Sequence, residues 1–352
     1  MGFKMAMVVL TIFLSIRYHW GNDYNAYFLE FYDLNHSFSS ILDTSHTNRS
    51  THNELGWVAI NRLIGLLKGG FFGLVICLTI IENYIIYRLI SKFVHPNYYP
   101  VSLFFYVFGT SFFAIGASMM RQFTCICLYF IVFELMTEKR VKFYLFYSVF
   151  IIFLGATIHR SNIFMLLTLP LYFVNIKRSK WYVSIYVVLV SIYIIWTMWA
   201  PNYFVDIIAD IVESSEDLTE YSSYLSQKGD VANSGLGIMF RYVLILFLFY
   251  AMPLLGEKEQ TVVFFSIIPF FIYPLMSFVP MLSRFTYYFT YLSVILWPTL
   301  LHKLKKDKVI LFFLLAGQCI MMTKGFFDFY SSKLWKEAFY TYQTIFDAPN
   351  WM

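Results

Sequence analysis

A small set of charged residues interrupts the long apolar runs of this chain, away from its lysine clusters. The set consists of Arg17, Glu54, Glu82, Arg121, His159, Arg160, Arg241 and Arg284. Arginine is its commonest member and lysine is absent from it. A guanidinium is permanently charged and offers two N–H groups to two phosphate oxygens at once, so an arginine cluster suits a pyrophosphate better than lysines would. The set therefore predicts an anionic ligand.

Arg121 is the strongest candidate for binding that anion. It lies in "GASMMRQFT", between two long apolar runs, and the small residues just before it permit close approach of backbones. We expect Arg121, Arg160 and Arg284 to bind the pyrophosphate. Arg17 is a fourth candidate, although Arg17 and Arg284 also fit helix-end residues that reach lipid headgroups. Arg241 is set aside because it fits that second interpretation.

The set also holds groups that could remove a proton from a hydroxyl group, which requires a carboxylate or an imidazole within hydrogen-bond reach. The candidates are His159, Glu54 and Asp23. We expect His159 and Glu54 to act near the reacting bond and Asp23 to position a sugar or a loop. His159 also fits an orienting donor or a hydrogen-bonded helix-end residue, and Asp23 also fits a structural cap in its turn.

Tyrosine and amide side chains close to these charges are candidates for sugar contacts. They are Tyr24, Tyr27, Gln122, Asn162 and Tyr288. Asn162 shares a helix face with His159, whereas Arg160 looks elsewhere, because adjacent helical residues point about 100 degrees apart. Tyrosines also gather at bilayer interfaces, and that explanation is favoured for most of them.

No motif for a metal or a cofactor accompanies these residues. The sequence has no phosphate-binding glycine loop, no dinucleotide glycine fingerprint, no His-Glu-x-x-His and no Gly-x-Ser-x-Gly. It also lacks the Asp-x-Asp that holds a metal for nucleotide-sugar donors. We therefore expect a metal-independent reaction that uses no cofactor.

The composition indicates what kind of protein must position these residues. Of 352 residues, 59% are hydrophobic and only 13% are charged, too few to cover the surface of a soluble fold of this length. The net charge of +5 comes from short basic clusters between apolar runs, so topology explains it better than nucleic-acid binding does. The sequence predicts an all-α polytopic integral membrane protein that forms a single domain, 1–352.

About 11 apolar segments are long enough to cross a bilayer, given that a spanning helix needs about 20 residues or somewhat fewer. We predict spans at 2–17, 70–90, 98–117, 121–137, 141–158, 161–176, 181–200, 235–255, 261–281, 285–301 and 309–323. Basic connections at 138–142, 177–180 and 302–308 predict the cytoplasmic side.

Segments 18–69 and 201–234 and an interfacial tail, 325–352, then fall on the periplasmic side. Segment 201–234 is strongly acidic, which fits that side. Residues 55–67 are apolar but short, and we expect an amphipathic helix at the outer interface. If this helix spans instead, the amino terminus moves to the outside.

Taken in order, the polar stretches resemble landmarks of the EpsG family. "RYHWGNDYNAYFLEFYD" resembles its R-x3-G-x-D-Y-x2-Y opening, Glu54 with Gly56 its next acidic landmark, and "MMRQF" its I-R-Q helix start. The stretches "ATIHRSNIF", "EYSSYLSQ", "SRFTYYFTYLSVILWP" and "FYTYQTIF" follow in family order. The short lead-in before Arg17 and the replacement of valine-glycine-threonine-aspartate by "HWGND" depart from the family pattern.

This resemblance implies a Wzy-like polymerase of exopolysaccharide, capsule or O-antigen repeat units, with a GT-C-like glycosyltransferase architecture. Such enzymes lie in the bacterial inner membrane and work at its periplasmic or outer face. They transfer an oligosaccharide from one undecaprenyl-pyrophosphate carrier to the repeat unit on another. The implied partners are the lipid-linked donor and acceptor, membrane lipids and a chain-length regulator, with no nucleic acid.

Three other functions fit a polytopic protein with arginines. A flippase or transporter of the same lipid-linked oligosaccharide would also bind pyrophosphate, but transporters usually show paired repeats and a midplane site. A membrane acyltransferase that modifies surface polysaccharide would need a histidine within reach of an acyl donor. A structural assembly subunit would not need the arginines.

Overall fold

The computed structural model of this chain describes most of its predicted spans. The described residues are 2–36, 40–42, 54–109, 112–173, 188, 191, 236–276, 282–304, 308–331 and 333–348. The predicted span at 181–200 lies outside them except for two single positions, and the acidic segment 201–234 lies wholly outside them.

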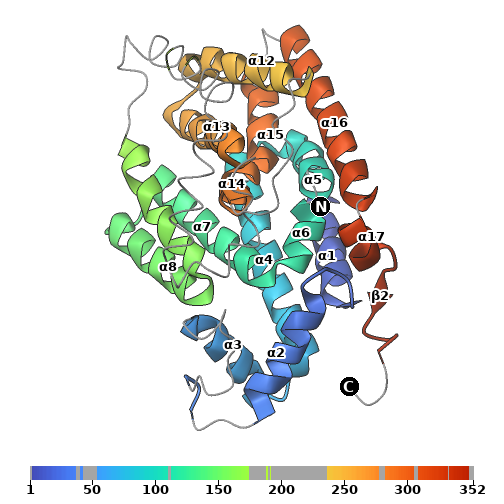
Figure 1. Ribbon diagram of the computed structural model, residues 1–352. Coiled ribbons are helices and arrows are strands. Elements are labelled where there is room, and N and C mark those ends of the chain that lie inside the picture. Colours follow the sequence, from blue (N-terminus) through green and yellow to red (C-terminus); the bar gives the residue numbers. More distant parts are fainter. Residues whose placement is uncertain are drawn as a thin grey trace, which may run out of the picture.

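The described part of the chain is almost entirely helical (Figure 1). Its first half contains α1 (Gly2–Ser15), α2 (Tyr24–His36), α3 (Leu55–Leu66), α4 (Gly70–Phe93), η1 (Pro96–Tyr98), α5 (Tyr99–Phe108), α6 (Phe112–Ser118), α7 (Met120–Glu138), α8 (Tyr144–Ile158) and the 3-10 helix η2 (Arg160–Phe173). Its second half contains α12 (Leu236–Ala251), η5 (Met252–Leu254), α13 (Glu257–Met276), α14 (Leu282–Thr290), α15 (Ser293–Lys303), α16 (Lys308–Ser331) and α17 (Lys333–Phe339). The prediction of an all-α membrane protein is confirmed.

Three helices in the described ranges are long and apolar enough to cross a bilayer: α4, α7 and α16. They correspond to the spans predicted at 70–90, 121–137 and 309–323. The apolar stretch of α7 is 72% buried and that of α16 only 17%. Helix α7 is therefore central to the bundle, and α16 presents apolar side chains such as Phe312 and Ile320 outward.

Other predicted spans are interrupted. The segment at 98–117 is divided between α5 and α6, and the one at 285–301 is divided between α14 and α15 at a turn in which the N–H of Val294 donates to the carbonyl of Tyr291 (3.2 Å). The segment at 161–176 corresponds to η2, which contains Pro170. A helix of 10 residues such as α5 is only about 15 Å long, so these pieces are shorter than a straight crossing requires.

The amphipathic helix predicted at 55–67 is present as α3. It buries Trp57 and Arg62 against the bundle and exposes Leu63 and Leu66. Helix α2 was not predicted, because the stripe that it buries (Tyr24, Tyr27, Phe31 and Leu34) is largely aromatic and is interspersed with charged residues. In Figure 1, α2 and α3 lie together at one end of the molecule, and α12 lies at the other.

The two ends of the described chain meet. Strand β1 (Arg17–Tyr18) pairs antiparallel with β2 (Gln343–Thr344), with Arg17 opposite Thr344. The predicted tail at 325–352 begins inside α16, which continues to Ser331, and then forms α17 and β2. Figure 1 shows this tail running beside α1. The carboxyl-terminal segment is thereby attached to the strand that leads into α2.

Candidate functional site

The carboxylate of Glu54 joins several polar elements at one end of the bundle. Glu54 directly precedes α3 and is only 3% exposed. Its Oε2 accepts a hydrogen bond from Nη1 of Arg121 (2.6 Å), and its Oε1 lies 3.0 Å from Nδ1 of His159. Oε1 also accepts from the backbone N–H of Arg160 (3.2 Å). One carboxylate therefore connects the start of α3, the start of α7 and the junction of α8 with η2.

Gly56 explains how Glu54 reaches that junction. A Cβ at position 56 would lie 2.1 Å from Oγ1 of Thr157, a distance that no real contact allows. Only glycine therefore lets the first turn of α3 pack directly on the last turn of α8. This close approach explains why a glycine, Gly56, stands two positions after the acidic residue Glu54.

Hydrogen bonds and nearby positive charges together have a larger effect on the pKa of Glu54 than its burial has. Burial acts to raise the pKa of Glu54, but the hydrogen bond from His159 and the charges of Arg121 and His159 oppose it. The backbone N–H of Arg160 acts in the same direction, and the net pKa lies below the usual glutamate value. Glu54 is thus a carboxylate at neutral pH.

His159 occupies a break in the helical backbone. Its backbone is extended (φ −150°, ψ 116°), its N–H still donates to the carbonyl of Gly155 (2.8 Å), and its carbonyl accepts from Asn162 N–H (3.0 Å). The His159 side chain remains 19% exposed. Because Glu54 faces Nδ1, a proton held at that nitrogen leaves Nε2 free to act as a base. The pair has the geometry of a carboxylate-oriented histidine.

Arg121 lies between Glu54 and α2. Its guanidinium carbon is 5.5 Å from the centre of the Tyr27 ring, and its side chain is 17% exposed. Its Nε is buried without a hydrogen-bond partner among the described residues. The charge of Arg121 is thus already paired with a carboxylate, whereas we had expected it to bind pyrophosphate directly.

The guanidinium groups of Arg160 and Arg284 have N–H groups that are available to a ligand. Arg160 is exposed and Arg284 is half-buried, and neither guanidinium forms a hydrogen bond or ion pair with any residue that the structure describes. Gln122, which follows Arg121, donates from Nε2 to the backbone carbonyl of Arg284 (2.7 Å). This bond attaches α14 to the first turn of α7 and so holds Arg284 near the cluster.

Asp23 reaches the same cluster from the loop before α2. Burial raises the pKa of Asp23, and the charges of Arg284 and Arg121 partly oppose that rise. Its backbone N–H donates to Oγ of Ser118 (3.2 Å). Gly21 has φ +125°, and a Cβ there would lie 3.0 Å from Cα of Ser118. The loop that carries Asp23 is thus fitted closely against the end of α6.

The carboxyl-terminal segment supports this loop from the other side. The N–H of Gly21 donates to the carbonyl of Ala338 in α17 (3.1 Å), and the N–H of Ile345 donates to the carbonyl of Ile16 (2.8 Å). The Trp20 ring packs edge-on against Phe339 with centroids 4.9 Å apart. The described part of the tail contributes no side chain to the cluster, but it fixes the backbone that leads to Asp23.

Arg17 lies apart from the cluster. Only 2% of it is exposed, and its Nη1 donates to the backbone carbonyl of Leu14 and to Oγ1 of Thr79 (3.0 Å). Its Nη2 donates to the carbonyl of Ala117 (3.3 Å). Glu82 contributes the nearest opposing charge. Arg17, expected as a fourth pyrophosphate ligand, instead joins α1, α4 and α6 in the interior.

All five expected sugar contacts are buried, and three of them form contacts within the bundle interior. The hydroxyl of Tyr24 donates to the backbone carbonyl of Arg17 (3.1 Å), and the ring of Tyr288 lies 5.8 Å from that of Tyr129. Nδ2 of Asn162 donates to the carbonyl of Ile152 (2.8 Å). Tyr24 and Tyr288 are 0% exposed and Asn162 is 1% exposed. Tyr27 and Gln122 are also buried, 7% and 3% exposed, but they lie beside Arg121 and Arg284 respectively.

Sequence reasoning missed Glu30 and Trp57. Nε1 of Trp57 donates to Oε2 of Glu30 (3.1 Å), and the Trp57 ring packs against that of Tyr27. Asp23, Tyr27 and Glu30 stand at intervals of four and three residues, which places them on one face of α2. That spacing was the available signal, but a helix had to be assigned at 24–36 before it could be used.

The cluster differs from a metal site. Within the described ranges, no three His, Cys, Asp or Glu side chains gather in a way that could hold a metal ion. What the cluster offers is a histidine oriented by a carboxylate, two guanidinium groups with free donors, and the half-buried carboxylate of Asp23. These groups can remove a proton and stabilise a leaving phosphate.

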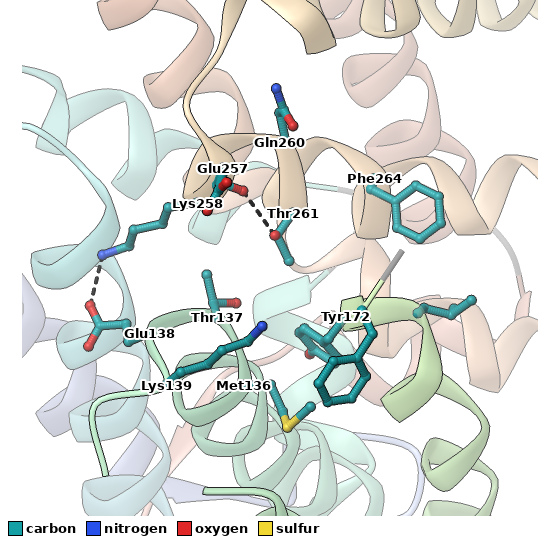
Figure 2. Close-up of a pocket in the computed structure, with 12 residues that line it drawn as sticks. Met136, Thr137, Glu138, Lys139, Tyr172, Glu257, Lys258, Gln260, Thr261 and Phe264 are labelled. Atoms are coloured by element: carbon teal, nitrogen blue, oxygen red, sulfur yellow. Dashed lines mark hydrogen bonds and ion pairs between the residues drawn. The ribbon is translucent and has the colours of Figure 1, made fainter. Parts of the chain in front are cut away.

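A separate cavity of about 350 Å³ lies at the other end of α7 (Figure 2). It is enclosed by the end of α7, the end of η2 and the start of α13, and Nζ of Lys258 contacts Oε1 of Glu138 there (2.8 Å). Arg121 and Glu138 are 17 positions apart in α7, so the cavity lies about 26 Å along the helix from the cluster. No predicted site residue lines the cavity, so we do not assign the chemistry to it.

Comparison with known protein families gives a match over nearly the whole chain. The model of the EpsG family matches residues 3–344, a stretch that includes every residue of the cluster. No curated protein matches, and no solved structure does.

Proposed function

The chain belongs to the EpsG family, and we propose that it is a polysaccharide polymerase that joins oligosaccharide repeat units carried on undecaprenyl pyrophosphate. The family is generally exopolysaccharide polymerase-like and of glycosyltransferase type. The observation that carries the proposal is the Glu54–His159 pair next to guanidinium groups with free donors. This combination fits the transfer of a sugar from a pyrophosphate to a hydroxyl group.

His159 is the proposed general base. The acceptor hydroxyl gives its proton to Nε2 of His159 while its oxygen forms a bond to the anomeric carbon of the donor. Glu54, 3.0 Å from Nδ1, holds the ring in the required tautomer and stabilises the charge that the ring gains. A single displacement of this kind inverts the anomeric centre.

Arg160 and Arg284 are the proposed ligands of the leaving group. As the bond from the anomeric carbon to the pyrophosphate breaks, its electron pair moves to a phosphate oxygen, and preorganised donors stabilise that charge. Both guanidinium groups have N–H groups available for this role. Arg121 adds positive charge nearby, and its bond to Glu54 (2.6 Å) keeps that carboxylate aligned with His159.

Asp23 is the proposed sugar contact. Its carboxylate is half-buried beside Arg284 and Arg121 and can accept hydrogen bonds from sugar hydroxyls. Tyr27 and Gln122 shape the cluster from α2 and α7. Arg17 acts at a distance in this proposal, because it fixes the end of α1 from which the Asp23 loop starts.

The setting of the reaction is part of the proposal. We place the chain in the bacterial inner membrane with about 11 spans, a GT-C-like architecture and the cluster at the periplasmic or outer face. The basic connections at 138–142 and 302–308 support this orientation. Lipid-linked donor and acceptor are its substrates, and a chain-length regulator is a proposed partner.

A polymerisation assay tests this function. Purified protein in detergent is mixed with a synthetic undecaprenyl-pyrophosphate repeat unit, and the products are separated by size. Products longer than one repeat, lost in His159→Gln, support the proposal. A folded wild-type protein that never extends the substrate would contradict it.

A further inference from the structure

Glu30 is a buried carboxylate for which the proposed reaction has no role so far. It is 5% exposed and lies on the face of α2 that also carries Asp23 and Tyr27. Its Oε2 accepts the hydrogen bond from Trp57 (3.1 Å), but its Oε1 is buried with no partner among the described residues. Half of this carboxylate is therefore unsatisfied.

An unsatisfied buried carboxylate is costly, because it has lost water without gaining equivalent hydrogen bonds. The structural bond to Trp57 does not require the charge, since the neutral amide of glutamine would accept the same hydrogen bond. The packing of α2 on α3 therefore does not explain a glutamate at this position. The negative charge must act on something nearby.

Arg121 is the group on which it acts. Tyr27 connects Arg121 to Glu30, because its ring lies 5.5 Å from the guanidinium carbon of Arg121 and 5.5 Å from the ring of Trp57, the donor to Glu30. Arg121 also interacts electrostatically with Tyr27, Glu54 and Glu30, and its Nε is buried without a hydrogen-bond partner among the described residues. The guanidinium of Arg121 therefore interacts with two carboxylates. It contacts Glu54 directly, and it is connected to Glu30 by way of Tyr27. The electrostatic effect of Arg121 on Glu54 therefore depends on how much of the Arg121 charge is balanced by Glu30.

We propose that Glu30 is a positioning residue for the Glu54–His159 pair, which acts through Arg121. The guanidinium of Arg121, which is bonded to Glu54, partly neutralises the charge of that carboxylate. Glu54 then stabilises a proton on His159 less strongly. Glu30 offsets that neutralisation and keeps His159 a stronger base. The inference rests on the proposed function, because it assumes that His159 accepts a proton.

Other charges face this region and must stay fixed in any test. They are Asp23 from the loop before α2, Tyr27 from α2, Glu54 before α3, Arg121 from α7, His159 just before η2, Arg160 at the start of η2, and Arg284 from α14. Glu82 offers a matched control, because it is also 5% exposed and accepts one side-chain hydrogen bond, from Thr124 (2.7 Å). Its electrostatic neighbour is Arg17 instead of Arg121.

The first readout is the pH dependence of polymerisation by the purified full-length protein. Glu30→Gln should move the acid limb of the profile of kcat/KM to lower pH by about half a unit to one unit, the order of shift expected when one nearby charge is removed in a protein. Glu30→Asp keeps the charge and should leave the limb in place even if the rate falls. Glu82→Gln should also leave it in place.

The second readout does not need activity. Histidine-labelled protein is titrated by NMR, and the His159 signal, one of seven histidines, is identified by its loss in His159→Gln. In Glu30→Gln the signal should change at lower pH than in the wild type, and in Glu82→Gln at the wild-type pH. If Glu30→Gln does not fold, Trp57→Phe serves instead, since it removes the hydrogen bond that positions the Glu30 carboxylate (3.1 Å) and should shift the signal the same way.

The two readouts separate the two proposals. A shifted His159 signal in a protein that forms no polymer would support the charge coupling and refute the polymerase. Polymerisation with the same acid limb and the same His159 titration in Glu30→Gln as in the wild type would overturn the role of Glu30 and leave the polymerase standing.

Discussion

Replacement of Glu54 by glutamine is the sharpest perturbation that the cluster allows. Glutamine has nearly the shape of glutamate, so α3 can keep its approach to α8 over Gly56. The charge is removed, and with it the ion pair to Arg121 (2.6 Å) and the charged acceptor at Nδ1 of His159 (3.0 Å). The amide group of glutamine can also present a donor to Nδ1 and so favour the wrong tautomer.

The magnitude follows from these contacts. Loss of one partner from a fully buried ion pair costs about 3–5 kcal/mol of unfolding free energy. The Arg121 side chain is 17% exposed and can rehydrate in part, so we expect a loss of about 1–3 kcal/mol. General-base catalysis contributes about 100- to 10,000-fold in rate, and because Glu54→Gln misorients the base, we expect kcat to fall within that range.

The assay combines thermal unfolding in detergent with the rate of repeat-unit addition at saturating substrate. Glu82→Gln is the control, because it also replaces a buried glutamate side chain with an amide but lies away from the Glu54–His159 pair. It should keep kcat within about tenfold of the wild type, far from the loss expected of a missing base. A Glu54→Gln protein that polymerises at the wild-type rate would refute the assignment of His159 and Glu54.

Three other predictions concern the rest of the cluster. Arg160→Gln and Arg284→Gln should each lower kcat/KM by about 10- to 100-fold, the value of a charge-assisted hydrogen bond, measured with the same repeat unit; wild-type values in both would contradict their role as phosphate ligands. Asp23 has a raised pKa in the fold, so its ionisation opposes folding as pH rises through that value. Asp23→Asn should therefore unfold at a higher temperature than the wild type at pH 7, a gain that disappears below about pH 4, and a lower unfolding temperature at pH 7 would count against the burial argument. Gly21→Ala forces a Cβ to within 3.0 Å of Ser118 at φ +125°, and its polymerisation should fall at least tenfold in a folded protein; unchanged activity would show that the loop need not be held closely.

The sequence predicted the fold class and the long spans because apolar content and length are local properties. It did not predict the interruptions between α5 and α6 or between α14 and α15. These depend on packing against other helices, and a window that averages hydropathy does not detect them. Helix α2 was also missed, since its buried face combines tyrosines and a glutamate with Phe31 and Leu34 and is defined by its contacts with α3 and α4.

For the site, residue types predicted the cluster better than they predicted individual roles. An isolated charge among apolar residues indicates a partner, but it does not say whether that partner is a ligand or the protein itself. Arg17 and Arg160 illustrate this, because both follow an apolar run, yet Arg17 is buried and donates to two backbone carbonyls, whereas Arg160 is exposed. The pairing of Glu54 with Arg121 crosses 67 residues of sequence, and no local pattern specifies it.

The central claim is that this chain forms glycosidic bonds with a lipid pyrophosphate as the leaving group. Broken helices such as α14 and α15 also occur in transporters, so the decisive measurement follows bond formation and substrate movement in the same sample. Purified protein in liposomes is supplied with a fluorescent lipid-linked repeat unit, and the product length, the released lipid pyrophosphate and the leaflet of the label are recorded together. We predict longer products with one lipid pyrophosphate released per bond formed, both lost in Glu54→Gln; movement of the label between leaflets with no new bond would contradict the claim.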